Sequence, residues 1–441
     1  MPLIDGADLR TFLFQLSLLM ITALLLGRLT QRIGLTPIVG ELCAGVLWGP
    51  SVLGAISPAA AARIFPPDAA AFHMVEAVGQ VGVLLLVGLT GAHIDLSLVR
   101  RRGSTVAKVS IGGLILPAAL GVGIGLLVPA SLIPDTTERN TFALFLAVAM
   151  AVSAIPVIAK TLTDLRMVHR NVGQIILCSV TIDDIVGWAT LSVVSAMATT
   201  GVRFGNVLLS VGSIIGVFLV ALLLRPPMRG LLRRADRADG PDGSATTIGV
   251  VVVAVLTAAA LTQAAKLEAV FGAFVCGMVL GNSGVLAHHR LAPLRATVLA
   301  FLAPLFFSLA GLRMDLTALA DPVVVVTGLV VLTAAIVGKF AGAYLGARWS
   351  RMSHWEGLAL GAGMNARGVI EVIIAMVGLR LGVLSVEIYT VIILVAIVTS
   401  LMAPPLLRHT MARVEQTAEE DLRAQTFDGR PMARNTDPAG G

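Results

Sequence analysis

Charged residues are scarce in this 441-residue chain, at 13%, whereas a soluble globular chain has roughly 25%. Hydrophobic residues make up 56% of the chain, and the mean hydropathy is +0.91. Apolar runs long enough to cross a bilayer as helices recur from Thr11 to Leu407. The scarcity of charge therefore excludes a water-soluble fold and predicts an all-α polytopic membrane protein.

Cysteine is also rare, and its three positions lie within apolar runs, without paired spacing and far from any histidine cluster. We therefore expect no disulfide framework, no metal cluster and no cofactor. The net charge of +6 comes from basic residues spread over the connections between apolar runs rather than gathered on one face. This distribution predicts the lipid bilayer as a partner and argues against nucleic acid.

The apolar runs predict about thirteen spans of membrane length, centred near residues 19, 42, 84, 116, 152, 184, 214, 256, 276, 306, 335, 366 and 396. Basic residues gather on alternate connections between the spans. This pattern predicts a protein of the cell membrane with its N-terminus outside and its C-terminus in the cytoplasm. Arg28 and Arg32 follow the first run where a cleavable signal would have small residues. We therefore expect that run to be retained as a span.

Most of the chain, residues 1–408, is expected to form one transmembrane exchanger domain. The polar stretch 225–245 is predicted to link its two halves on the cytoplasmic side. The tail, residues 409–441, mixes Glu, Arg, Gly and Pro without an apolar period, so we expect it to be disordered. The glycines between Gly121 and Gly125 lie inside an apolar run and favour close helix packing over nucleotide binding.

Two spans are interrupted at corresponding places in the two halves. The fifth span carries Ser153–Ala154–Ile155–Pro156 at its centre, where proline removes a helix hydrogen bond. The twelfth span is glycine-rich around Asn365. Because their offset is an odd number of spans, the two must cross the membrane in opposite directions. This pattern is typical of inverted repeats with broken helices in transporters.

Two adjacent carboxylates, Asp183 and Asp184, lie at the middle of the sixth span. Ionisable groups at this depth are costly and mark ion or proton pathways. Neighbouring residues point about 100° apart on a helix, so we expect the two acids to have different roles. Their oxygens suit a monovalent cation such as Na⁺, and carbonyls freed by the broken spans could complete its shell. Such a site binds either a proton or a cation, which predicts competition between them.

Other charged residues within the spans have more than one interpretation. Lys339 lies on the eleventh span, from which its amine could approach the acids or extend to the cytoplasmic interface. Arg367 and Glu371 share a helix face in the twelfth span, and we favour a structural role for this pair. The acids expected to be interfacial or packing residues are Glu41, Asp95 and Asp315.

These features resemble the monovalent cation:proton antiporter-2 family, which includes bacterial sodium/proton antiporters, Kef-type potassium efflux systems and plant cation/proton exchangers. The resemblance rests on Asp183–Asp184, the stretch from Ser153 to Pro156, Lys339 and Asn365–Ala366–Arg367–Gly368. It covers about residues 10–408. Supporting stretches are Gly40–Glu41–Leu42–Cys43–Ala44–Gly45, Gly49–Pro50–Ser51, Phe271–Gly272–Ala273–Phe274 and Pro304–Leu305–Phe306–Phe307.

The resemblance implies a transporter rather than an enzyme, built as a homodimer in which a core of roughly residues 105–198 and 322–408 moves as an elevator. It also implies that Asp184 is the ion ligand and that Asp183 partners Lys339. Kef-type members typically have Gln–Asp in place of the two acids, together with a nucleotide-binding domain, so a gated potassium-efflux role is weakened. The surroundings of Pro156 and Trp188 resemble the plant exchangers more closely, which keeps K⁺ open.

We therefore expect exchange of Na⁺, or of Li⁺ or K⁺, for protons by alternating access, made electrogenic by the Asp183–Lys339 pair. The alternatives are a K⁺/H⁺ antiporter and a gated cation efflux channel, although a channel would not need a lysine beside the acids. An intramembrane aspartyl protease would need its two carboxylates close together on different helices. The adjacency of Asp183 and Asp184 disfavours that enzyme.

Overall fold

The computed structural model describes residues 5–33, 35–66, 70–94, 103–200, 204–239, 244–286, 288–417 and 419–420. These residues form helices joined by turns and short connections, and the described ranges contain no strand. As predicted, the protein is an all-helical, multi-span membrane protein. Asp95 lies outside the described residues.

The first part of the chain forms α1 (Gly6–Arg32), α2 (Pro37–Trp48), α3 (Pro58–Ile64), α4 (Ala70–Ala92), α6 (Gly103–Leu127), α7 (Arg139–Ala151), α8 (Ile155–Asp164), α9 (Asn171–Thr200) and α10 (Phe204–Asp239). The second part forms α11 (Ala245–Ala264), α12 (Ala269–Gly281), α13 (Ala292–Thr297), α14 (Ala303–Leu312), α15 (Pro322–Trp349), α16 (His354–Met364), α17 (Val369–Arg380) and α18 (Val386–Met411). Short π-helical turns at Pro50–Gly54 and Val298–Leu302 extend α2 and join α13 to α14.

Ten helical stretches of the described chain are long and apolar enough to cross a membrane. Helices α16 and α17, which meet at an angle of 44°, make an eleventh when they are taken as one span. Helices α7 and α12 are apolar but shorter. The expected thirteen spans are therefore reached only when α12 and the α7–α8 pair are counted as well.

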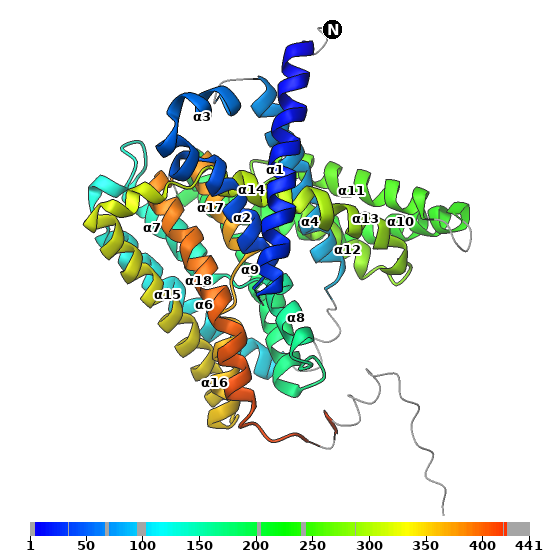
Figure 1. The fold of residues 1–441 in the computed structure, drawn as a ribbon. Coiled ribbons are helices and arrows are strands. Elements are labelled where there is room, and N and C mark those ends of the chain that lie inside the picture. Colours follow the sequence, from blue (N-terminus) through cyan, green and yellow to red (C-terminus); the bar gives the residue numbers. More distant parts are fainter. Residues whose placement is uncertain are drawn as a thin grey trace, which may run out of the picture.

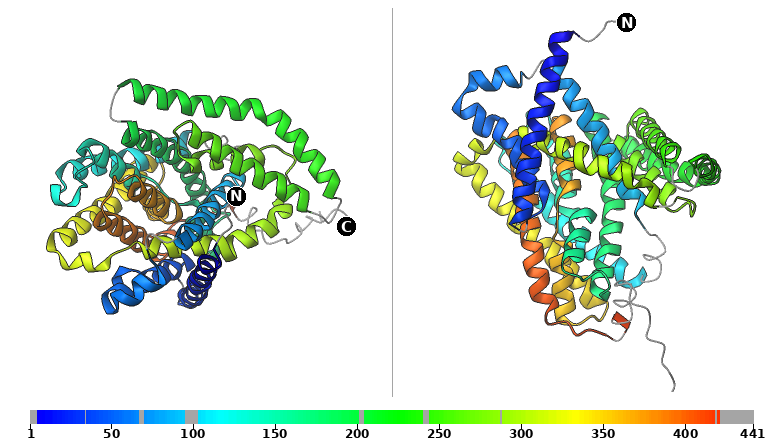
Figure 2. Two further views of the ribbon diagram at one scale, coloured as in Figure 1. Left: turned by 90° about the horizontal axis from the view of Figure 1, so that it is seen from above. Right: turned by 45° about the vertical axis from the view of Figure 1, so that its right-hand side comes forward.

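The helices pack as two groups (Figures 1 and 2). We call α6 to α9 and α15 to α18 the core group, and α1, α2, α4, α11, α12 and α14 the scaffold group. Helix α10 packs against α9, α11 and α12 and runs along the outer edge of the molecule in Figure 2. Almost none of its apolar segment is buried, and large exposed side chains lie at Leu208, Leu209, Leu219, Leu222 and Leu223. An apolar surface of this kind is suited to lipid or to another protein.

Small residues let the core helices approach closely. A side chain at Gly112 of α6 would collide with the backbone of α15 at Gly342, and the reverse substitution would collide in the same way. A Cβ atom at Gly121 or Gly125 would lie 2.6 Å or 2.5 Å from an alanine Cα of α7. These glycines therefore serve helix packing, as the sequence predicts.

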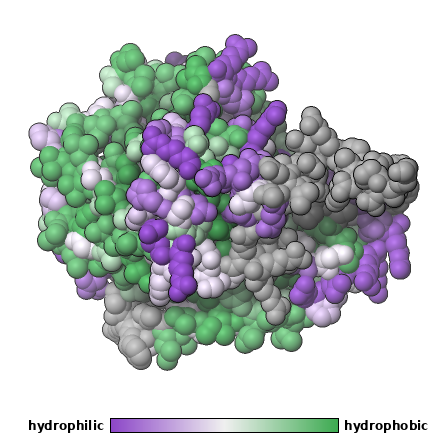
Figure 3. Space-filling view, turned by 90° about the horizontal axis from the view of Figure 1, so that it is seen from below, coloured by the Kyte–Doolittle hydropathy of each residue, from purple (hydrophilic) through white to green (hydrophobic). Residues whose placement is uncertain are grey.

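The molecule has two opposite ends, which we name by the chain termini. Helix α1 begins at the end drawn uppermost in Figure 1, the N-face, and α18 ends at the opposite end, the C-face. Figure 3 views the molecule from the C-face and shows polar side chains over its middle, with apolar side chains at the left and lower margins. This distribution fits a polar end that is bordered on those sides by an apolar, lipid-facing surface.

The stretches expected to be linker and tail are partly helical. Helix α10 continues through Pro226 and Pro227 to Asp239, and buried Leu232 packs this extension against the protein. Residues 240–243 lie outside the described ranges. In the expected tail, α18 extends to Met411, and residues 421–441 are again outside the described ranges.

Candidate ion-binding site

Two broken helices cross in the core group. Helix α7 ends before residues 152–154 and α8 follows, while α16 ends before residues 365–368 and α17 follows. The amide of Ala154 donates a hydrogen bond to the carbonyl of Ala366 at 3.2 Å, which joins the two breaks. Helices α7 and α17 lie toward the N-face, and α8 and α16 lie toward the C-face (Figure 1). The two broken spans therefore run in opposite directions, as the inverted-repeat pattern predicts.

The residue types at the breaks explain why the helices stop there. Pro156 lies in the first turn of α8, where a missing N–H group costs little because that group has no partner within the helix. Ile155 opens the same helix. Gly368 precedes α17, and a Cβ atom there would lie 2.6 Å from Val157 of the other broken helix. A glycine is therefore needed for the two chains to cross at this distance.

The carbonyl groups that end α7 face two buried cations. Lys339 of α15 donates to the carbonyl of Ala151 at 2.5 Å. Arg367, in the break before α17, donates to the carbonyls of Ala149 at 2.9 Å and Met150 at 2.5 Å. Carbonyls at a helix C-terminus carry partial negative charge and have no partner within the helix. Both basic side chains therefore stabilise a helix end that the break would otherwise leave unsatisfied.

Asp183 of α9 forms an ion pair with Lys339, with 2.6 Å between Oδ2 and Nζ. Both side chains are fully buried, so the lysine does not extend to an interface. Ser153 lies within hydrogen-bond distance of Asp183, at 3.2 Å, and of the carbonyl of Met364, at 2.9 Å. A serine hydroxyl has one proton, so it donates to one of these acceptors at a time.

Asp184, the next residue, has a different environment. Its side chain is fully buried, and neither carboxylate oxygen has a hydrogen-bond partner within the described part of the chain. The side-chain amide of Asn365, in the second break, is likewise buried and without a partner among those residues. A buried carboxylate is costly unless it is neutralised or solvated. Asp184 therefore offers oxygen ligands that a proton or a cation can occupy.

Arg367 and Glu371 form the second buried ion pair, at 3.1 Å, within the break and the first turn of α17. Arg367 also approaches the carbonyl of Ala335 at 3.4 Å, and Ser400 donates to the Arg367 backbone carbonyl. The guanidinium thus connects α7, α15 and α17. This geometry fits the structural role that we favour for the pair.

A cavity of about 790 Å³ extends from the C-face toward the crossing. Its wall comes from α1, α2, α4 and the start of α14 on the scaffold side, and from α8 and the start of α17 on the core side. Ile155, Val157 and Val369, which flank the two breaks, line its inner part. The charged and titratable lining residues are Arg28, Glu41, His93, Lys160, Asp164 and Arg295.

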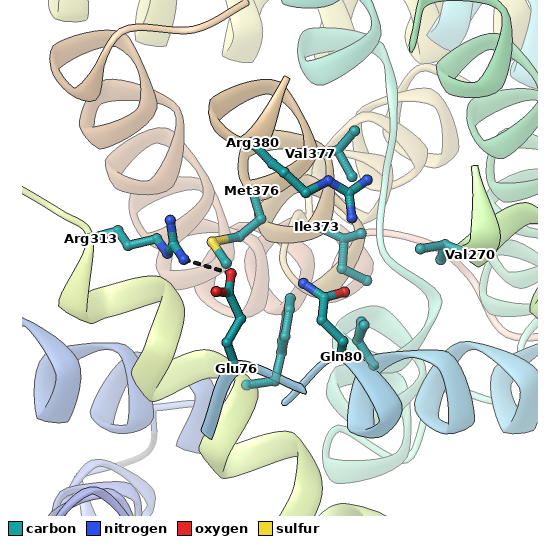
Figure 4. A pocket seen from close by; sticks show the side chains of 10 residues that line it. Glu76, Gln80, Val270, Arg313, Ile373, Met376, Val377 and Arg380 are labelled. Atoms are coloured by element: carbon teal, nitrogen blue, oxygen red, sulfur yellow. Dashed lines mark hydrogen bonds and ion pairs between the residues drawn. The ribbon is translucent and has the colours of Figure 1, made fainter. Parts of the chain in front are cut away.

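The N-face side of the same boundary is nearly closed. The pocket there holds only about 20 Å³ and lies between scaffold helices and α17 (Figure 4). Arg313 pairs with Glu76 at 2.6 Å, with both residues in the scaffold group. Arg380 of α17 pairs at 2.9 Å with Glu268, which precedes α12, so this pair joins core to scaffold. The structure is therefore open toward the C-face and closed toward the N-face.

Sequence reasoning missed the cavity and the pair between core and scaffold, because both depend on how helices far apart in the chain face each other. The expectation for Glu41 was packing or an interface, whereas its side chain lines the C-face cavity. Asp315 accepts a hydrogen bond from the amide of Thr317 and caps a short helical turn near the N-face. That contact fits the interfacial role expected for Asp315.

Residues 18–413 match the transmembrane sodium/hydrogen exchanger family. The chain belongs to this family. It is 31% identical over 385 residues to the Na(+)/H(+) antiporter NhaS4 of Synechocystis, covering 87% of this chain and 93% of the relative. It is 29% identical to Cation/H(+) antiporter 15 of Arabidopsis thaliana and 25% identical to K(+)/H(+) antiporter 1 of Saccharomyces cerevisiae, over 90% and 91% of this chain. The chain spans about half the length of these plant and yeast relatives, at 48% and 46%.

The fold is similar to that of the sodium proton antiporter MjNhaP1 from Methanocaldococcus jannaschii. The TM-score is 0.69 at 16% identity, covering 92% of this chain and 99% of that chain. This exchanger is therefore a monovalent cation/proton antiporter with a known antiporter fold, and its family is one of transporters rather than enzymes.

Proposed function

We propose that this exchanger transports Na⁺ against protons at Asp184, by alternating access of one site to the two faces. The observation that carries this proposal is the fully buried Asp184 carboxylate, which has no partner among the described residues, beside an Asp183 that already has one. A proton or a cation can neutralise Asp184, but both cannot occupy it together. Competition at one carboxylate couples the two fluxes in opposite directions when the site changes face only while it is occupied.

The two-group architecture supports alternating access by an elevator-like movement of the core group against the scaffold. The site lies in the core group, and the cavity and the narrow pocket both lie at its boundary with the scaffold. Opening toward the N-face would require the Arg380–Glu268 pair to separate, because its partners belong to different groups. The C-face cavity would narrow in the same movement.

The exchange is electrogenic in this proposal because Lys339 takes part in the proton cycle. With the cation bound, both carboxylates are charged and Lys339 has released a proton. When the cation leaves, one proton returns to Lys339, which pairs again with Asp183, and a second proton occupies Asp184. Two protons then move against one monovalent cation, so the site carries a different net charge in the two directions. Individual titrations of three coupled groups are hard to assign, so charge movement is the better observable.

The cation itself is tested by reconstituted exchange. Purified protein in lipid vesicles with a trapped pH dye receives NaCl, LiCl, KCl or choline chloride separately. Na⁺ should drive the largest proton movement and choline none, while a larger response to K⁺ would overturn the Na⁺ assignment. Cation flux that ignores an imposed proton gradient would contradict coupling and support the channel alternative.

Orientation and assembly are also part of the proposal. The distribution of basic residues supports an outside N-terminus and a cytoplasmic C-terminus in the cell membrane. A reporter fused after Arg413 should be cytoplasmic, and a cysteine at Ser131 should be labelled from outside. The exposed apolar faces of α1 and α10 are suited to a homodimer as well as to lipid. Chemical cross-linking in membranes should then give a species of twice the monomer mass.

A further inference from the structure

Glu41 has an unusual environment for a membrane-spanning carboxylate. It lies on α2 with 8% of its surface exposed, and its side chain lines the C-face cavity. The Ser308 hydroxyl lies within hydrogen-bond distance of the Glu41 backbone carbonyl, at 3.2 Å, and of the Pro304 carbonyl, at 2.8 Å. Its carboxylate has no hydrogen-bond or ion-pair partner among the residues that the structure describes. Packing contacts explain the position of the backbone but not the choice of an acid.

The other charges around the cavity make this acid distinctive. Arg28, Lys160 and Arg295 give the wall a positive balance that opposes cation entry. The second carboxylate in the described lining, Asp164, is paired with Lys160 at 3.0 Å. Glu41 is therefore the lining carboxylate without an ionic partner among the described residues. A mobile cation or a proton is the neutralising group that the cavity can supply.

Glu41 also lines the cavity that leads from the C-face toward the candidate site. The cavity begins at the C-face and ends beside the two breaks, and the Asp183–Asp184 site lies in the adjoining core group. Glu41 belongs to the scaffold group, so the core would move past it during alternating access. A carboxylate fixed at this place can hold a cation near the crossing before the core helices accept it.

We propose that Glu41 is a staging ligand, which binds a monovalent cation in the C-face cavity, in competition with a proton, before the cation reaches Asp184. This inference rests on the proposed function and adds a second, weaker cation-binding position to it. The staging role should affect the apparent affinity for a cation that is supplied at the C-face. It should not set the maximal rate, because Asp184 is the final ligand.

The kinetic test uses membrane vesicles whose exposed face is the C-face, verified with a tag after Arg413. In Glu41→Gln, the apparent KM for the cation should rise about fivefold while the maximal rate stays near that of the unaltered protein. Unit charges about 4 Å apart in water interact by about 1 kcal/mol, and a fivefold change corresponds to about that energy. Glu41→Asp should restore most of the affinity.

The matched control is Asp164→Asn, which removes a carboxylate from the same cavity. Because Asp164 already has Lys160 as its partner and its side chain is 60% exposed, the apparent KM should change much less than in Glu41→Gln. An unchanged KM in folded Glu41→Gln, or an equal rise in Asp164→Asn, would overturn the staging role. If either of these results is obtained and Asp184→Asn is inactive in the same assay, only the staging role has failed. If Asp184→Asn still exchanges, the proposed function has failed instead.

A structural readout locates the ion directly and does not depend on transport. Crystals of the purified protein soaked in Tl⁺ should show anomalous scattering beside the Glu41 carboxylate and beside Asp184. The peak beside residue 41 should disappear in Glu41→Gln, whereas the peak at Asp184 should remain. Should Glu41→Gln fail to fold, the unaltered protein and Glu41→Asp decide the matter, since an absent peak in both would contradict the proposal.

Discussion

The two buried ion pairs at the helix crossing differ in how they are built. Arg367 and Glu371 lie four residues apart, and the guanidinium also binds carbonyls of α7. Lys339 and Asp183 come from separate helices, and the acid's neighbour in sequence is the partnerless Asp184. Arginine stays charged under all ordinary conditions, whereas a buried lysine can exchange its proton. We infer that the first pair holds the crossing together and the second takes part in transport.

The largest expected effect is on stability, in Arg367→Gln. The substitution leaves Glu371 and the carbonyls of Ala149 and Met150 without their donor. Breaking a buried pair of this kind costs about 3–5 kcal/mol. Thermal unfolding in detergent should show a strongly lowered midpoint and a low folded yield. The double variant Arg367→Gln/Glu371→Gln should recover part of the loss, because no unpaired charge remains. An Arg367→Gln protein as stable as the unaltered one would remove the basis of the comparison.

Lys339→Gln should instead change transport more than stability. Asp183 keeps Ser153 as a possible donor and can be neutralised by proton uptake, so the protein should still fold. The response of exchange to an imposed membrane potential, at fixed ion gradients, should fall more than exchange itself. If exchange by the unaltered protein is indifferent to voltage, the electrogenic proposal is wrong, although antiport would stand.

These two pairs also show how far the sequence predicts the site. Proline, glycine and mid-span charge are local signals, so both breaks and all the acids and bases of the crossing were identifiable from the chain. The contacts of Arg367 with α7 were not, because they depend on the placement of a helix far away in sequence. The same limit applies to the cavity beside Glu41.

Helix length was harder to predict than helix position. Residues 225–239 read as a linker because they are polar and begin with a proline pair, yet they continue α10. The physical reason is tertiary, since Leu232 is buried against the protein and Arg290 pairs with Asp236 at 2.8 Å. Helical sequences with a buried contact remain ordered beyond the bilayer, and composition does not report such contacts.

Ion pairs at the N-face should affect transport less when they are broken than the ion pairs at the crossing do. In Arg380→Gln the loss of the pair with Glu268 should favour opening toward the N-face. Arg380 is 43% exposed, and pairs with exposed partners contribute about 0.2–1 kcal/mol. The apparent cation affinity should therefore shift by at most about fivefold in the vesicle assay. The matched control is Arg313→Gln, because the partner of Arg313, Glu76, lies in the same group. An equal shift in that variant would contradict the proposal that the Arg380–Glu268 pair separates when the core group moves.

The smallest effect on exchange is expected from Glu420→Gln. Burial would raise the pKa of the Glu420 carboxyl, but hydrogen bonds from the amides of Thr417 and Asn171, with the charge of Arg170, hold it below its usual value. Because the pKa of this carboxyl is lower in the folded than in the unfolded state, the contact stabilises the fold fully at pH values above the unfolded pKa. This stabilisation is lost as the pH falls through the folded pKa. At neutral pH the variant should lose its tail to limited proteolysis faster than the unaltered protein. Its exchange should be unchanged, and a tail equally protected in both would contradict the contact.

The most direct test of the central claim measures protons released when a cation binds. NaCl, LiCl or KCl is added to purified protein in weakly buffered detergent solution, with choline chloride as the control, and the pH is recorded. The transported cation should release protons from the unaltered protein and far fewer from folded Asp184→Asn, in which Glu41 is the proposed group that can still exchange a proton for the cation. Proton release from Asp184→Asn equal to that of the unaltered protein would show that cation and proton do not compete at this carboxylate.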